Sequence, residues 1–326
     1  MGVTHLRAYQ KISNARIVAV CGVHHLPKNG ILRGVTGNIK SSDAIRLGPT
    51  VKVYSEFEKL LADPEVELVD ICTPTPFHAP QVIAALKSGK HVLCEKPLAR
   101  TSADAQKIVK AAKVARTFLM PAMCMRFWPG WSEVKEIIAR KVYGKVLTAG
   151  FRRISRLPEW SSSNAYAGGD SGGALYDLHI HDTDFANFLF GRPQKVYSSG
   201  VIGANGLIDH VVTQYHYPGG PTVQAEGSWL NQRGFNMAFV INCERATLEF
   251  DYAQASDTLL ISETGKKTRA LKLKAADGYG AEIKYFVDCV AHRRAPKIVT
   301  ATDALTALQI CEAEEKSVRR GAPVRL

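Results

Sequence analysis

The stretch E-L-V-D-I-C-T-P-T-P-F-H-A-P-Q-V-I-A-A-L-K-S-G-K-H-V-L-C-E-K-P at residues 67–97 decides the fold of the first third of the chain. Glu67–Thr73 and Lys90–Cys94 are short and largely apolar, which is typical of buried strands. Between them, Pro80–Ser88 carries apolar residues on one side of a helix, and Gly89 follows where such a helix ends. A strand, a helix and a second strand in this order predict parallel strands joined by a crossover helix.

The same alternation continues on both sides of this unit. Ala15–Cys21 and Thr117–Pro121 have the apolar pattern of strands, and Ser102–Ala115 has helical periodicity. Gly22–Thr50 is less regular, and we expect a long loop there with one helix near Ser41–Leu47. This part of the chain is therefore predicted to form a parallel sheet with helices between its strands.

The pattern changes after residue 145, where strand-like segments follow one another with few helices between them. The turn Tyr217-Pro218-Gly219-Gly220 has hairpin chemistry, because glycine tolerates a positive φ. The predicted strands are Lys145–Ile154, Lys195–Val201, His210–Tyr217, Thr222–Ser228, Asn236–Cys243 and Thr258–Glu263. Two helices, Tyr279–Ala291 and Thr302–Arg319, close the chain. The predicted fold class is α/β plus α+β, with a parallel-sheet domain at residues 1–122 and a large, mostly antiparallel sheet in a domain at residues 123–326.

Composition excludes several other classes of protein. The 326 residues are 46% hydrophobic and 22% charged, unlike disordered, collagen-like or coiled-coil chains. No apolar run approaches the ~18 residues of a membrane span, and the start, MGVTHLRAYQ, lacks the apolar core of a signal peptide. The seven cysteines include no Cys-x-x-Cys pair. We therefore expect a reduced, cytoplasmic protein with no membrane partner.

The net charge of +12 is unevenly distributed along the chain. Residues 1–122 hold 17 Lys and Arg against 9 Asp and Glu, whereas residues 123–326 hold 25 against 21. No run of basic residues is longer than two, and no motif for nucleic-acid binding is present. A diffuse basic excess of this kind is compatible with nucleic acid, with a phosphorylated ligand, or with solubility alone.

Lys96 lies directly after the strand Lys90–Cys94, in the motif Cys-Glu-Lys-Pro. Ligands of open α/β sheets bind beyond the carboxyl ends of the strands, so we expect Lys96 at the mouth of a cleft. A lysine there can hydrogen-bond a substrate oxygen and favour its developing negative charge. A solvated surface lysine beside a turn proline is an equally supported interpretation.

The preceding strand ends in Cys-Thr-Pro-Thr-Pro-Phe-His, which includes Thr73, Pro74 and His78. The prolines stiffen this turn, and its threonine side chains are placed to meet the sugar or phosphates of a cofactor. The alternative is a turn whose prolines only end the strand, with His78 at the start of the next helix.

A second candidate site lies in G-G-A-L-Y-D-L-H-I-H-D-T-D at residues 172–184. His179 and His181 would share a metal ion on a strand, but on a helix two such positions diverge by about 200°. The apolar spacing that follows and Gly191 favour a helix. There, Asp177 and His181 are one turn apart, so Asp177 would orient His181 as a general acid–base. A metal site and a merely structural histidine stay open as alternatives.

Candidates for substrate binding are weaker. Arg126 opens the second part of the chain in Met-Arg-Phe-Trp-Pro, where a packing cluster between the domains is an equally good interpretation. Trp160, Asn164 and Tyr166 form an aromatic and polar set in one loop, which suits a sugar. Aromatic residues are common in loops, so this pattern by itself is not specific.

Taken together, these motifs resemble the glucose–fructose oxidoreductase/inositol dehydrogenase family (Gfo/Idh/MocA) along nearly the whole chain. The resemblance is carried by GKHVLCEKP at residues 89–97 and by GGALYDLHIHD, which begins at Gly172. It implies a Rossmann-type first domain, hydride exchange between NAD(P) and a secondary alcohol of a sugar or cyclitol, and homodimers or homotetramers. It also implies that Lys96, Asp177 and His181 are catalytic. The implied cofactor-binding residues are Gly2, Thr73, Pro74, His78, Glu95 and Lys96.

Two departures from the family pattern concern the cofactor. Gly2 aligns with the third glycine of G-x-G-x-x-G only, so the first strand and two glycines are missing. That strand is central in a 3-2-1-4-5-6 sheet, so we expect a gap. Gly22 stands where an acidic residue would bind the ribose, and Lys28, Arg33 and Lys40 follow it. This change is compatible with NADP, and equally with a domain that has lost cofactor binding.

Three functions are therefore weighed. The first is an NAD(P)-dependent oxidoreductase acting on a polyol or sugar. The second is a lyase, hydrolase or epimerase that uses a tightly held nicotinamide transiently. The third is a sugar-binding or regulatory protein without redox activity, which the missing strand and Gly22 favour.

Overall fold

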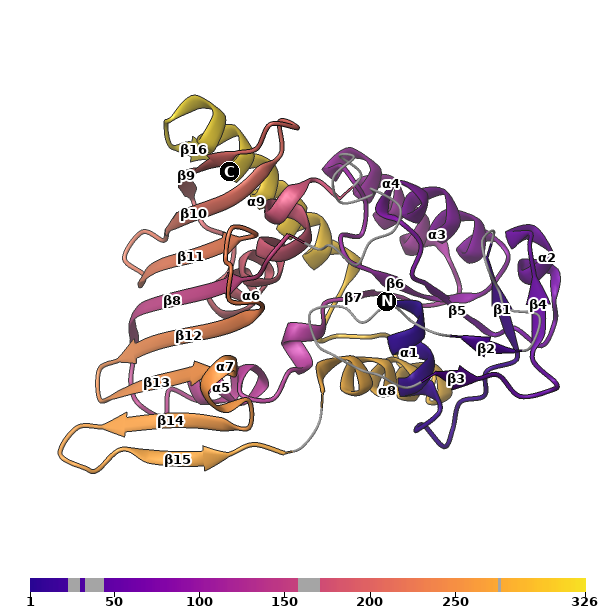
Figure 1. The fold of residues 1–326 in the computed structure, drawn as a ribbon, viewed down its shortest axis with the longest axis horizontal. Helices are drawn as coiled ribbons and strands as arrows, with labels where there is room; N and C mark the ends of the chain where they lie inside the picture. The colour runs from indigo at the N-terminus through magenta and orange to yellow at the C-terminus, as the bar shows by residue number, and fades with distance from the viewer. Residues whose placement is uncertain (23–29, 33–43, 158–170, 275–276) are drawn as a thin grey trace.

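The computed structural model describes residues 1–22, 30–32, 44–157, 171–274 and 277–326. Five parallel strands and their helices occupy one end of the molecule, and a nine-stranded sheet occupies the other (Figure 1). Helices α6 and α9 lie between these two parts, and α8 runs beneath α1 (Figure 1). No helix among the described residues combines the length and the apolar character needed to cross a bilayer.

The first part alternates strands and helices, as predicted. Its sheet strands are β1 (Ala19–Cys21), β4 (Lys52–Tyr54), β5 (Leu68–Ile71), β6 (His91–Glu95) and β7 (Leu119–Ala122), and all their pairings are parallel. The helices are α1 (Gly2–Tyr9), α2 (Phe57–Ala62), α3 (His78–Lys87) and α4 (Ser102–Val114), with a 3-10 turn at Thr75–Phe77. The parallel-sheet prediction is therefore confirmed.

One local prediction in this part is wrong. The expected helix near Ser41–Leu47 is not formed at its carboxyl end, because Ile45–Arg46 is the short strand β3. It pairs antiparallel with β2 (Ile31–Leu32). Ile45 is 3% exposed, so burial of an isolated β-branched residue outweighs the weak helical periodicity of this stretch.

The expected gap in the parallel sheet is present. The strands form two separate sheets, β1 with β4 and β5 with β6 and β7. Strands β1 and β5 are not paired with each other, and both line one cavity of about 790 Å³. The spatial order is that of a doubly wound 3-2-1-4-5-6 sheet without its strand 1.

The second part is built on the predicted large sheet. Its strand order is β15-β14-β13-β12-β8-β11-β10-β9-β16, and every pairing is antiparallel except β8 with β11. The bounds are β8 (Val146–Ile154), β9 (Lys195–Ile202), β10 (Ile208–His216), β11 (Thr222–Ser228), β12 (Asn236–Cys243), β13 (Ala246–Asp251), β14 (Thr258–Glu263), β15 (Arg269–Lys272) and β16 (Val324–Arg325). Strands β13, β15 and β16 were not expected from the sequence, because they are short or carry few apolar residues.

Helices α5 (Trp131–Ala139), α6 (Ile180–Phe190) and α9 (Ala301–Arg320) cover the inner face of this sheet, and a short α7 (Tyr252–Ala255) lies beside β12 and β13. Helix α8 (Gly278–Ala291) packs instead against α1 and β6. Trp131 is fully buried and packs against Phe151, Phe185 and Phe239. Aromatic rings at these separations stabilise the contact between helix and sheet.

The last two helices of the chain pack into the core of the first half. Phe286 of α8 and Leu308 of α9 belong to the hydrophobic core of the parallel sheet, although they lie far along the chain. The division into residues 1–122 and 123–326 stays a prediction, since the last two helices bury side chains against both sheets.

Candidate active site

The site begins at the carboxyl ends of two neighbouring parallel strands. Ile71 of β5 lies opposite Cys94 of β6, so the turn at Thr73 and Pro74 lies beside the turn at Lys96. Lys96 Nζ donates to Asp177 Oδ1 at 2.9 Å and to the Asp177 backbone carbonyl. The structure thus brings together two of the residues that the sequence proposed for catalysis, although they are 81 positions apart.

Asp177 and His181 lie on a helix, as predicted, but its first turn is a π-helix at Leu175–His179. A glycine pair leads into it: Gly173 has φ 79°, and a Cβ there would lie 2.7 Å from the carbonyl oxygen of Ile208. Any other residue at this position would collide with strand β10.

The expected contact between Asp177 and His181 is not formed. The Asp177 carboxylate pairs with Lys96, and His181 Nδ1 is buried without a partner among the described residues. The π-turn explains the difference, since it bonds residues five apart and disturbs the i, i+4 alignment of a regular α-helix. Asp177 therefore orients Lys96 rather than His181.

His181 is held in its neutral form. Burial lowers its pKa well below the ordinary value, and the positive charges of Lys96 and Arg153 lower it further. Arg153 is itself fixed by the buried carboxylate of Asp182, with its Nε 3.0 Å from Oδ2. A neutral imidazole at neutral pH can accept a proton, as a general base must.

His179 faces different surroundings. It is fully buried, with Nε2 3.3 Å from the Tyr215 hydroxyl and 3.5 Å from Glu314 Oε1. It therefore belongs to a polar cluster inside the second half, whereas His181 lies near Lys96. The divergence of two histidines on a helix, which argued against a shared metal ion, agrees with these contacts.

The buried side chain of His78 contacts the backbone of both turns, at Thr73 and at Pro97. It is 1% exposed, with Nδ1 2.8 Å from the Pro97 carbonyl oxygen and Nε2 2.7 Å from that of Thr73. Both ring nitrogens therefore face backbone carbonyl oxygens, and the interpretation of His78 as a cofactor contact stays a prediction. Thr73 and Pro74 are exposed, so they stay candidates.

Glu95 is buried in a charge cluster beneath α1, and its assignment to the cofactor stays a prediction. His5 Nε2 lies 3.0 Å from Glu95 Oε1, and His5 Nδ1 lies 2.8 Å from Asp70 Oδ2. Burial opposes protonation of His5, but the charge of Asp70 prevails and raises its pKa well above the ordinary value. Burial likewise favours neutral Glu95, yet its hydrogen bond with His5 lowers the pKa below the usual range.

This cluster also contains ligand-type atoms of His5, Asp70 and Cys72 within 4.8 Å of one another. Carboxylates engage both ring nitrogens of His5, so we interpret the group as an ion-pair cluster rather than a metal site. Sequence reasoning missed the pairing of His5 with Asp70, because it depends on the packing of α1 against β5 and β6.

Glu282 of α8 is a third acid near the same cluster. It is 0% exposed, and neither carboxylate oxygen has a hydrogen-bond partner among the described residues. Burial raises its pKa well above the ordinary value, and the negative charge of Glu95 raises it further. Glu282 is therefore protonated at neutral pH. No local pattern distinguishes this residue from a surface glutamate of a helix.

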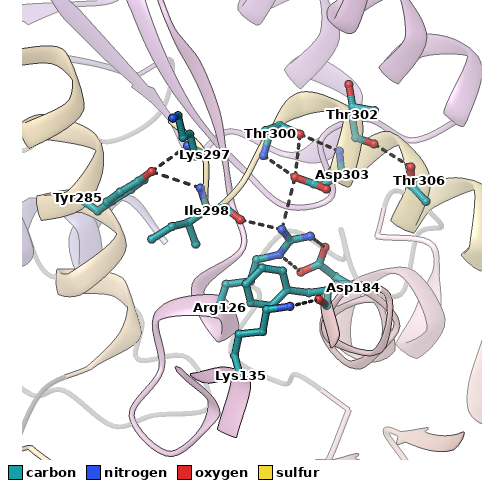
Figure 2. A network of polar contacts seen from close by, with 11 residues as sticks. Arg126, Lys135, Asp184, Tyr285, Lys297, Ile298, Thr300, Thr302, Asp303 and Thr306 are labelled. Atoms are coloured by element: carbon teal, nitrogen blue, oxygen red, sulfur yellow. Dashed lines mark hydrogen bonds and ion pairs between the residues drawn. The ribbon is translucent and has the colours of Figure 1, made fainter. Parts of the chain in front are cut away.

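Arg126 is occupied by structural contacts. Its Nε and Nη2 donate to the two carboxylate oxygens of Asp184 at 2.8 and 2.6 Å, and Nη1 donates to the Ile298 carbonyl at 2.7 Å. Figure 2 shows this guanidinium enclosed between α6 and the segment that leads to Asp303. The side chain of Arg126 is buried and paired, which favours the packing interpretation, and its role as a substrate contact stays a prediction.

Of the remaining candidate binding residues, the structure describes only Gly2. Trp160, Asn164 and Tyr166 lie outside the described residues, as do Lys28, Arg33 and Lys40. Gly2 is the first residue of α1, where a Cβ would lie 3.8 Å from Cys72 Cβ. No side chain caps this helix, so its first backbone N–H groups are available to an anion.

Comparison with known proteins agrees with this architecture. Residues 1–122 match the family model described as an oxidoreductase family with an NAD-binding Rossmann fold. Residues 131–249 match that of the GFO/IDH/MocA C-terminal domain.

Curated relatives and solved structures point the same way. The trans-1,2-dihydrobenzene-1,2-diol dehydrogenase of Mus musculus is 34% identical over 177 residues, 52% of this chain and 51% of that protein. The chain thus spans about half the length of the first relatives it matches. The myo-inositol 2-dehydrogenase of Thermotoga maritima is 28% identical over 286 residues, 84% of each chain. A levoglucosan dehydrogenase, solved with NADH and levoglucosan, has the same fold, with a TM-score of 0.76 at 23% identity over 84% of each chain.

The fold and the position of the site define a two-domain protein with an NAD-binding Rossmann fold joined to an open antiparallel sheet. The chain belongs to the Gfo/Idh/MocA family.

The Arg126–Asp184 pair yields a stability prediction. We expect Asp184→Leu to lower the free energy of unfolding by about 3–5 kcal/mol, because it removes the bidentate partner of a buried guanidinium and leaves it only the longer contact with Asp303 as a counter-charge. The double variant Arg126→Met/Asp184→Leu should recover most of that loss, since an apolar pair needs no counter-charge. Urea unfolding measures both. The control is Lys59→Met, which removes an exposed pair with Glu56 and should cost less than about 1 kcal/mol. A double variant as unstable as Asp184→Leu would contradict the interpretation.

The raised pKa of Glu282 predicts how the stability of the protein changes with pH. Its raised pKa means that the folded protein keeps a proton which the unfolded chain loses above about pH 4.5. Wild-type stability therefore falls as the pH rises above that point, by about 1.4 kcal/mol per pH unit at most. Glu282→Gln removes this loss, so its gain over wild type should grow between pH 5 and pH 8 in urea unfolding. The exposed Glu249→Gln serves as control. An equal difference at both pH values would contradict a protonated Glu282.

Proposed function

We propose that the protein is an NAD(P)-dependent dehydrogenase that transfers a hydride between the cofactor and a secondary alcohol of a sugar or cyclitol. One observation carries the proposal: Lys96, at the carboxyl end of β6, is fixed by Asp177 on the helix that bears a neutral His181. The names of relatives, which include a myo-inositol and a dihydrodiol dehydrogenase, support a polyol as the substrate class.

In this mechanism His181 accepts the hydroxyl proton of the alcohol. The Lys96 ammonium holds the reacting oxygen and stabilises the negative charge that develops on it as the proton leaves. Asp177 anchors that ammonium through its carboxylate and its backbone carbonyl, so the charge is positioned before substrate binds. A bound nicotinamide supplies the hydride acceptor.

The residues present fit a dinucleotide in part. Exposed Thr73 and Pro74 would hold it at the sheet edge, and Gly2 would present the amino end of α1 to its phosphates. Gly22 ends β1 with no carboxylate to repel a 2′-phosphate, which favours NADP over NAD. Trp160, Asn164 and Tyr166 stay the proposed contacts to the sugar.

A second candidate is a sugar-binding protein without redox activity. Gly22 favours it, because it stands where an acidic residue would bind the ribose hydroxyls of the cofactor. Such a protein would bind a sugar or polyol without binding NAD or NADP.

Three variants test the catalytic proposal. His181→Ala should lower kcat by about 10²–10⁴-fold in alcohol oxidation with NADP, because the general base is lost. Lys96→Met should lower kcat and kcat/KM together, and Asp177→Asn should have a smaller effect, because it loosens Lys96 without removing it. The acid limb of wild-type kcat/KM should lie below pH 6.5, since the pKa of His181 is lowered.

The control for these variants is His216→Ala, an exposed histidine on β10 that should keep full turnover. Full turnover in His181→Ala would exclude the mechanism. Calorimetry that detects a polyol but neither NAD nor NADP would select the second candidate.

We also propose that the nine-stranded sheet pairs with a second copy of the chain. Its outer face exposes apolar side chains on three strands: Tyr197 and Val201 of β9, Val240 of β12 and Leu260 of β14, each at least 37% exposed. Exposed apolar side chains that recur across one sheet face suit an interface between protein chains.

The oligomer is tested by light scattering after gel filtration. Val240→Glu should convert a dimer or tetramer into a smaller species, because a charge would be buried at the centre of the contact. Val114→Glu, at an 84% exposed position on α4, should leave the mass unchanged. A wild-type mass equal to one chain would overturn the proposal.

A further inference from the structure

Contacts with other elements hold the π-turn at Leu175–His179 at both of its ends. In this turn Ile180 N donates to the Leu175 carbonyl oxygen, five residues earlier. Such turns are rare and lie mostly inside α-helices, frequently at functional sites. At the amino end, Gly173 approaches the backbone of β10. The carboxyl end is His179, a residue that the proposed mechanism does not use.

The imidazole of His179 lies in a space that Gly227 leaves open on the large sheet. His179 is fully buried, and a Cβ on Gly227 of β11 would lie 2.5 Å from its Cβ and 2.9 Å from its Nδ1. Any side chain at residue 227 would therefore displace this imidazole. The close fit determines where the carboxyl end of the π-turn meets the sheet.

Polar groups from two further elements hold the same imidazole. His179 Nε2 lies 3.3 Å from the Tyr215 hydroxyl of β10 and 3.5 Å from Glu314 Oε1 of α9. Thr183 of α6 contacts the same two partners, because its Oγ1 lies 3.1 Å from the Tyr215 hydroxyl and donates to Glu314 Oε1 at 3.2 Å. We call these four side chains, each at most 4% exposed, the anchor network. Buried hydrogen bonds that satisfy one another in this way make side-chain positions rigid.

Asp177 lies two residues before His179 and faces the first half of the protein. Side chains two positions apart lie on nearly opposite sides of a helix. Asp177 Oδ1 accepts from Lys96 Nζ at 2.9 Å, whereas His179 contacts β10 and α9. The anchor network therefore fixes the rotation of the turn at which the Asp177 carboxylate reaches Lys96.

Without this anchor the π-turn can relax into a regular α-helix. Asp177 and His181 would then be one turn apart on the same face, and the carboxylate would exchange Lys96 for the imidazole of His181. The charged groups that act on His181 are Lys96 at the end of β6 and Arg153 of β8, which is paired with Asp182. The form of the turn thus decides whether a carboxylate joins these cations beside His181.

We propose that His179 is a positioning residue, which holds the π-turn in the form that directs Asp177 to Lys96 and away from His181. The inference rests on the proposed function, in which Lys96 holds the reacting oxygen and His181 accepts the proton. His179 itself acts only through the turn. A carboxylate beside an imidazole favours the protonated ring, so the anchor network also keeps His181 free to accept a proton.

Titration of His181 by NMR tests the proposal on the full chain, without cofactor or substrate. The protein is isotope-labelled at histidine Cε1, and the signal of His181 is the one that His181→Gln removes. We expect His179→Leu to raise the pKa of His181 by about 1 or more, because Asp177 then comes within reach of the imidazole. His179→Gln keeps an amide group where Nε2 lies, so it should titrate like the wild type.

Two further variants separate positioning from a general loss of packing. In an Asp177→Asn background no carboxylate can reach His181, so adding His179→Leu there should cause no rise in its pKa. Tyr215→Phe removes only the hydroxyl that faces His179, so it should raise the pKa of His181 in the same direction and by less. Circular dichroism and the urea midpoint show which variants have folded.

The matched control lies on the same strand as Tyr215. Thr213→Val removes the buried hydrogen bond between the Thr213 and Ser198 hydroxyls, 2.8 Å apart, and touches neither the π-turn nor the anchor network. It should lower the urea midpoint and leave the titration of His181 unchanged.

Turnover gives a second measurement of the same effect. His179→Leu should lower kcat about as far as Asp177→Asn does, because both loosen Lys96, and should move the acid limb of kcat/KM to higher pH. His179→Gln should keep the wild-type limb.

The outcomes are distinct. A pKa of His181 that rises in His179→Leu and Tyr215→Phe, but not when residue 177 is Asn, supports the proposal. An unchanged pKa in Tyr215→Phe and in a folded His179→Leu overturns it, as does an equal rise without the carboxylate of Asp177. Absence of dehydrogenase turnover in the wild type would overturn the proposed function instead, and the titration alone then decides whether His179 positions Asp177.

Discussion

The parallel register of β5 and β6, with Ile71 opposite Cys94, is the constraint on which the site depends. Parallel strands end at the same edge of a sheet, so this register places the turn at Thr73 beside Lys96. His78 then fixes the distance between the two turns through the carbonyl oxygens of Thr73 and Pro97. The ammonium of Lys96 is thereby directed to the one element of the second half that carries both Asp177 and His181.

Helix α1 is held beside this edge by a buried charge cluster, since His5 bridges Asp70 of β5 and Glu95 of β6. Contacts with α8 cover the opposite side of the helix. The cluster holds the carboxylates of Asp70 and Glu95 against a single base, His5. Because the pKa of Glu282 is raised, this third acid is protonated and adds no further negative charge to the buried cluster.

Residue patterns predicted the strands and the helix with Asp177 and His181, because both depend on local periodicity. They placed Lys96 correctly as well, since the position of a strand end follows once the strand is identified. They did not predict what long-range packing decides. Arg126 pairs with Asp184, and Glu95 pairs with His5 near the start of the chain. The π-turn places the Asp177 carboxylate against Lys96 instead of His181. Each of these contacts joins elements whose mutual distance no local pattern contains.

The electrostatics of the site favour one direction of proton movement. Burial, with the charges of Lys96 and Arg153, lowers the pKa of His181, so the neutral imidazole can receive a proton but is a weaker base than a free histidine. In the proposed mechanism Lys96, one of the cations that weaken this base, also stabilises the alkoxide. A lysine without Asp177 would shift this balance, because its charge would be free to turn toward solvent. The ion pair between Lys96 and Asp177 joins the two halves of the protein and fixes the position of the charge, which the proposed mechanism needs before the reacting oxygen arrives.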